Sequence, residues 1–123
     1  PRLPELPLAE ISVTDVQLDA ETGFKITDAR QVGFHNVTIN VKKGPVLLAD
    51  RTTGLELNSF KTLSPLPKTP VVELLDVRQV FLHGCVAAPD TDIFVRVLKS
   101  SAGEVELGAN NFKSAAQSVV RVK

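Results

Sequence analysis

The chain contains FKITDARQV at residues 24–32, VLLADRTTG at residues 46–54 and VELLDVRQV at residues 72–80. Each stretch begins with two apolar residues separated by one position and continues through an aspartate into a polar turn. The aspartates Asp28, Asp50 and Asp76 recur at intervals of 22 and 26 residues. A second short strand-like segment follows each copy, beginning at Gly33, Leu55 and Phe81. These copies indicate a structural repeat.

A repeat of this length, with two or three short strands in each copy, predicts a single-stranded right-handed parallel β-helix. In such a fold the inward side chains of successive coils stack in rows and supply the core. With the copies aligned without gaps, one row is expected to contain Phe24, Val46 and Val72, and a second Ile26, Leu48 and Leu74.

Turn residues are expected to fall at shared corners of the coils. The three aspartates would share one corner, where each side chain can accept hydrogen bonds from turn amides. A second corner is expected to contain Asn36, Asn58 and Gly84, since Asn and Gly both tolerate positive φ. The spacing of Arg30, Arg51 and Arg78 from the aspartates favours neutralising ion pairs over a catalytic carboxylate pair.

An antiparallel β-sandwich is the alternative fold, because it also has many short strands separated by turns. It does not require matched Asp and Asn corners. The predicted organisation is one β-helix domain, or a fragment of one, over residues 1–123, with a proline-rich lead-in at residues 1–8.

Composition excludes several classes of function. The 14 basic and 14 acidic residues balance, so nothing predicts a nucleic-acid partner. No apolar run approaches the roughly 20 residues that span a bilayer, so no membrane partner is expected. With one cysteine and two histidines, neither a metal site nor a cofactor is expected. Cys85 is predicted to be a buried, inert thiol, and His35 and His83 to occupy equivalent outer positions facing solvent.

Several segments resemble the late coils of polygalacturonase-like glycoside hydrolases, family 28. The resemblance covers roughly residues 3–112. It lies in LPELPL at residues 3–8, ISVTDV at 11–16, GFKITDA at 23–29 and FHNVTI at 34–39. It implies a right-handed parallel β-helix, hydrolysis of pectic polysaccharide by aspartates, and a secreted or periplasmic location.

The catalytic motifs of that family are incomplete in this chain. It contains no Asp-Asp pair and no Asn-x-Asp motif. The Gly-His-Gly motif is incomplete at His83-Gly84, because the preceding residue is Leu82 rather than glycine. The Arg-x-Lys motif is not kept near Lys25. No catalytic residue is therefore carried over. The resemblance implies the C-terminal part of such an enzyme, inactive alone; a free-standing module that binds polysaccharide or a partner protein is the alternative.

Partners and binding residues follow from this interpretation. A pectin-like polysaccharide is the expected ligand, and upstream coils or a second copy are expected at an exposed coil end. The candidate groove residues for polysaccharide binding are Lys25, Thr27, Asp28, Arg30, Asp50 and Arg51.

Overall fold

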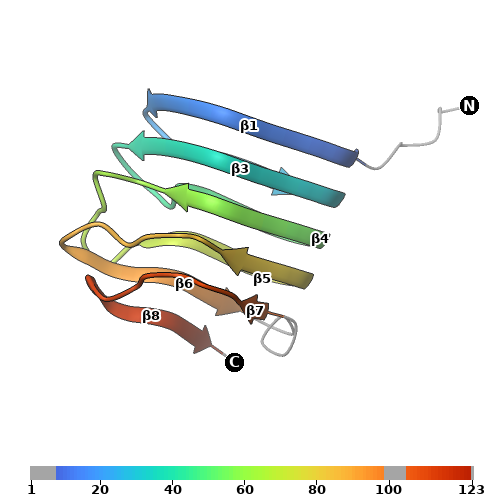
Figure 1. Cartoon of the computed structure of the whole chain (residues 1–123). Helices are drawn as coiled ribbons and strands as arrows, with labels where there is room; N and C mark the ends of the chain where they lie inside the picture. The colour runs from blue at the N-terminus through green and yellow to red at the C-terminus, as the bar shows by residue number, and fades with distance from the viewer. Residues whose placement is uncertain (1–7, 99–104, 123) are drawn as a thin grey trace, which may run out of the picture.

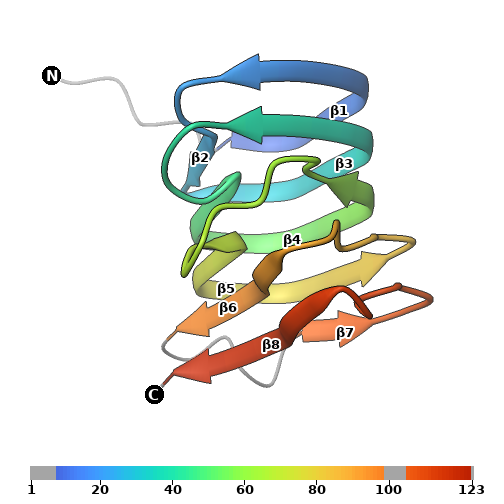
Figure 2. The same ribbon diagram turned by 90° about the vertical axis from the view of Figure 1, so that its left-hand side faces the viewer.

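The computed structural model describes residues 8–98 and 105–122. They form a right-handed parallel β-helix of about five turns (Figures 1 and 2). The strands are β1 (Leu8–Ala20), β2 (Phe24–Thr27), β3 (Ala29–Val41), β4 (Leu47–Lys61), β5 (Pro70–His83), β6 (Thr91–Leu98), β7 (Val105–Leu107) and β8 (Ala115–Val122). None of these residues forms a helix that is long and apolar enough to cross a membrane.

All named strand pairs are parallel. The hydrogen-bonded order is β1-β3-β4-β5-β6-β8, while β2 pairs with β4 and β7 with β5. The long strands bend around the core, so each turn contributes to three sides. We call residues 24–27, 47–50, 72–75, 95–98 and 119–122 side A. Side B contains residues 10–14, 32–35, 55–58, 80–83 and 105–107, and side C contains residues 16–20, 37–41 and 60–61.

The core consists of rows of inward side chains that cross successive turns. On side B the two rows are Ile11, Val32, Leu55, Val80 and Val105, and Val13, Phe34, Leu57, Leu82 and Leu107. The middle members of both rows are buried. Phe34 also contacts Phe60 edge to face, with ring centroids 5.5 Å apart. A single coil would expose its inward apolar side chains to water, so the stacking of these side chains between coils stabilises the fold.

Each turn changes direction at corners where the backbone has positive φ. The first corner row is Asp28, Arg51 and Asp76; the second is Glu10, Gln31, Gly54 and Gln79; the third is Asp15, Asn36, Ser59 and Gly84. The φ values in these rows lie between 49° and 80°. Side chains bridge neighbouring turns, since Asn36 Nδ2 donates to Asp15 Oδ1 at 2.8 Å. The corners thus fix where one side ends and the next begins.

The predicted parallel β-helix is confirmed, but the predicted register of the second copy is wrong by one residue. Phe24 is aligned with Leu47, not Val46, and Ile26 with Ala49, not Leu48. The cause is the run Val46-Leu47-Leu48, in which any of three apolar residues could begin the inward row. Alignment without gaps selects the first of them, whereas the fold uses the second.

The same shift changes the predicted corners. Arg51, not Asp50, shares the first corner with Asp28 and Asp76. Ser59, not Asn58, occupies the third corner with Asn36 and Gly84. A positive-φ corner therefore accepts Arg and Ser here, although Asn, Asp and Gly adopt this conformation more readily.

Two segments of the chain are less regular than the coils. Residues 1–7 of the predicted proline-rich lead-in lie outside the described residues, and Leu8 is the first residue of β1. Between β4 and β5, residues 62–69 form a loop rather than a strand. Leu66 in this loop packs against the core, so the loop is partly folded back onto the helix.

Candidate functional site

The structure spreads the six predicted binding residues around one edge of the helix. Lys25, Thr27 and Asp50 alternate with the inward residues of side A and so face outward. Asp28 and Arg51 lie at the first corner. Arg30 lies beyond this corner and is aligned with Thr53.

Ion pairs occupy three of these six residues. Arg51 Nε and Nη2 donate to the two carboxylate oxygens of Asp28 at 2.7 and 3.2 Å, and Nη1 donates to Asp50 Oδ2 at 3.3 Å. The hydrogen bond from Arg51 holds the pKa of Asp28 below its ordinary value. A carboxylate stabilised in its charged form is a poor general acid at neutral pH. The expected ion pairing at the aspartates is confirmed for Arg51.

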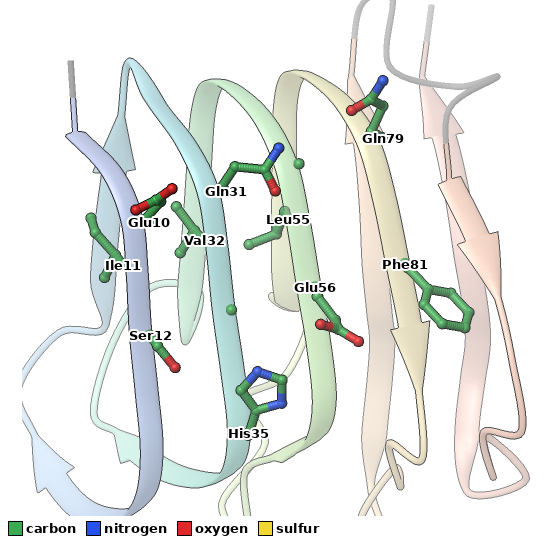
Figure 3. Close-up of a pocket in the computed structure, with 12 residues that line it drawn as sticks. Glu10, Ile11, Ser12, Gln31, Val32, His35, Leu55, Glu56, Gln79 and Phe81 are labelled. Carbon is green, nitrogen blue, oxygen red and sulfur yellow. The ribbon is translucent and has the colours of Figure 1, made fainter.

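A groove on side B was not predicted from the sequence. It has a volume of about 540 Å³ and crosses β1, β3, β4 and β5. Figure 3 shows its lining, which includes Glu10, Ser12, Gln31, His35, Glu56, Gln79 and Phe81. Three strand spacings of about 4.8 Å give it a length of about 14 Å across the coils.

The floor of the groove lies at Gly33. The outward row Ser12, Gly33, Glu56 and Phe81 runs across the four strands. A Cβ atom on Gly33 would lie 2.9 Å from His35 Nε2, so the imidazole covers the space that a side chain would occupy. His35 consequently lies between Ser12 and Glu56, as Figure 3 shows. The imidazole of His35, which lies over Gly33, therefore forms part of the lining at this point of the groove.

At the other end of the groove, three side chains hold one another in place. His83 Nε2 and Glu56 Oε2 are 2.7 Å apart. The rings of Phe81 and His83 stack with centroids 4.4 Å apart and an interplanar angle of 20°. Phe81 remains 38% exposed, so it presents an apolar ring to ligands while His83 supports it from one side.

The two groove carboxylates, Glu10 and Glu56, come from β1 and β4, which lie on either side of β3. Glu10 is aligned with Gln31 and so with Gly54, whereas Glu56 lies two residues further along β4. Their backbone positions are therefore separated by about 12 Å, from two strand spacings and two residue steps. Each carboxylate can therefore accept a hydrogen bond at a different point of the groove.

The histidines and the single cysteine are the other candidate ligands and nucleophiles in the sequence. His35 and His83 are equivalent, with Asn58 aligned between them, but both are half-buried rather than fully solvent-facing. Within residues 8–98 and 105–122, no three His, Cys, Asp or Glu side chains gather closely enough to hold a metal ion. Cys85 is buried, as predicted, and burial raises the pKa of its thiol.

Comparison with known proteins gives no match to a family model, a curated protein or a solved structure.

The groove itself had only a weak sequence signal. In QVGFH at residues 31–35 and QVFLH at residues 79–83, glutamine and histidine alternate with apolar residues at matching positions. Once the register of the two coils is known, this pattern shows that the glutamine and histidine side chains of both coils lie on the same outer surface.

Proposed function

We propose that this chain forms the C-terminal coils of a polygalacturonase-like glycoside hydrolase and binds pectic polysaccharide without cleaving it. The side B groove is the observation that supports a binding role. The incomplete catalytic motifs favour binding without catalysis. The resemblance over residues 3–112 supports the family.

The shape of the groove favours an extended polymer. Its walls come from four consecutive turns, so its long direction follows the helix axis. A polysaccharide can lie along such a surface and contact side chains from each of the four turns. Gln31 and Gln79 would provide amide donors and acceptors two turns apart.

The chemistry of the groove favours neutral, hydroxyl-rich sugar units. Each sugar hydroxyl both donates and accepts, which suits the amides, Ser12 and the carboxylate of Glu56. The exposed ring of Phe81 offers an apolar surface to the flat side of a sugar ring. Because Glu10 and Glu56 would repel carboxylates, we propose methyl-esterified rather than free-acid pectin as the ligand.

Binding is tested by calorimetric titration with pectin oligosaccharides of high and low methyl-esterification. We expect tighter binding of the esterified form, and we expect Phe81→Ala to weaken it about tenfold, which corresponds to about 1.4 kcal/mol. Leu63→Ala is the matched control, since Leu63 is exposed but does not line the groove. Equal affinity of the Phe81 variant and the unmodified chain would contradict the proposal.

Two further measurements separate the parent enzyme from a free-standing binding module. The chain alone should release no reducing ends from polygalacturonate; release would contradict its non-catalytic role. A reading frame that carries Asn-x-Asp and Asp-Asp motifs upstream of Pro1 supports the hydrolase. A frame without them favours the free-standing module.

A further inference from the structure

Glu56 in the side B groove lies between two histidines, one in the preceding turn and one in the following turn. His83 Nε2 is 2.7 Å from Glu56 Oε2. The imidazole of His35 covers Gly33, and Gly33 is aligned directly with Glu56 where β3 pairs with β4. Figure 3 shows His35 and Glu56 on neighbouring strands of the groove. One carboxylate therefore has beside it two groups that can each take up a proton.

The groove contains carboxylates but no permanently basic side chain. Among its described lining residues, Glu10 and Glu56 are acidic and none is Lys or Arg. Arg30 and Arg78 lie on the same strands as the two histidines, but they come before the second corner, whereas both histidines follow it. The histidines are therefore the side chains from which the groove can gain positive charge.

The other charged groups that face the two histidines are also carboxylates. Glu106 on β7 is aligned with Phe81, two residues before His83. Asp15 on β1 lies at the third corner, one residue beyond the row that contains His35. While the imidazoles are neutral, these carboxylates leave the surroundings of the groove negative.

From this arrangement we infer that His35 and His83 set the preference of the groove for esterified or free-acid pectin, and that this preference depends on pH. The inference rests on the proposed function. Imidazole is the side chain that ordinarily changes its charge between about pH 5 and pH 8. Above this range the two groove carboxylates repel a sugar carboxylate. Within it, each imidazole that takes up a proton offsets one carboxylate, so the free acid is accepted.

The direction of the effect follows from the linkage between proton binding and ligand binding. A ligand carboxylate interacts more favourably with imidazolium than with imidazole, so binding of free-acid pectin favours protonation of the histidines. Its affinity therefore rises as the pH falls, and its binding takes up protons. A methyl ester carries no charge, so binding of esterified pectin changes little. Carboxyl groups ordinarily titrate near about pH 4, so those of the groove and the sugar stay charged at about pH 5.5.

The inference is tested by calorimetric titration of the 123-residue chain with pectin oligosaccharides of low and high methyl-esterification, at about pH 7.5 and about pH 5.5. We expect the low-esterified form to bind about tenfold more tightly at the lower pH, and the affinity of the highly esterified form to change less than about twofold. Titrations in buffers of different ionisation enthalpy should show proton uptake with the low-esterified form alone.

Variants without imidazole separate the histidines from other effects of pH. His35→Gln combined with His83→Gln keeps amides that can form hydrogen bonds but removes both sites of protonation. For low-esterified pectin, the ratio of the affinities at the two pH values should fall to about one in this double variant and to about threefold in each single variant. Lys61→Gln, which removes a cation on side C outside the groove, should keep the ratio of about tenfold.

The outcomes distinguish this inference from the proposed function. Binding of both forms with no effect of pH on the low-esterified form would overturn the inference and leave the groove as a polysaccharide site. An unchanged ratio in the histidine variants would also overturn it, because other groups would then cause the pH dependence. Failure of both forms to bind at either pH would contradict the proposed function and the inference with it.

Discussion

Arg51 shows how a single residue can compensate for an unfavourable backbone conformation. Its φ of 49° lies in the left-handed region, which costs a residue with a side chain about 1–2 kcal/mol. From this position its guanidinium reaches the carboxylate of Asp28 in the preceding turn with two hydrogen bonds. Asp76, in the following turn of the same corner row, further favours the charged guanidinium. The corner therefore alternates acidic, basic and acidic residues.

At the residue scale, Arg51→Gln should reduce the loss of stability in acid. The Arg51 hydrogen bond lowers the pKa of Asp28 from its ordinary value of 3.8. A lowered folded-state pKa contributes stability above the unfolded value, and this contribution is lost as the pH falls through the folded value. The midpoints of urea unfolding at pH 7 and pH 3 should therefore differ less in the Arg51→Gln variant than in the unmodified chain. Arg78→Gln is the control; an equal change in both variants would contradict the role of Arg51.

At the element scale, the position of a side chain in its row should determine its contribution to stability. Leu57 and Leu107 belong to one inward row, but Leu57 is 0% exposed and Leu107 is 46% exposed. Leu57→Ala should cost about 2–5 kcal/mol in free energy of unfolding, because it leaves a cavity. Leu107→Ala should cost less than about 1 kcal/mol. Urea denaturation measures both; similar losses would contradict independent coil-by-coil stacking.

The strands also show what the sequence could and could not predict. Alternating apolar residues and matched corner residues were enough to predict parallel coils. The register of β4 was not predictable, because Val46, Leu47 and Leu48 are all apolar and each suits an inward row. The groove depends on that register, because the side chains that line the groove come together only when Gly33 is aligned with Glu56. The fold was therefore more predictable than the site.

At the scale of the whole molecule, protection from amide hydrogen exchange should decrease from the middle of the stack to its ends. β4 is hydrogen-bonded to β2 and β3 on one edge and to β5 on the other, whereas, among the residues that the structure describes, β1 pairs only with β3 and β8 only with β6. Amides open locally more easily where fewer contacts hold them. Exchange followed by mass spectrometry at low protein concentration should find β1 and β8 least protected. Uniform protection in all strands would contradict this gradient.

The corner positions carry a consequence for changing the length of the chain. Corners follow one another at residues 28, 31 and 36, then 51, 54 and 59, then 76, 79 and 84, so their spacing within a turn is constant. Successive third corners, at Asp15, Asn36, Ser59 and Gly84, are nevertheless 21, 23 and 25 residues apart. All added length thus enters along one seam, between side C and the next side A. Foreign peptides grafted into this seam would be displayed in a column, one per turn, while the walls of the helix stay in alignment.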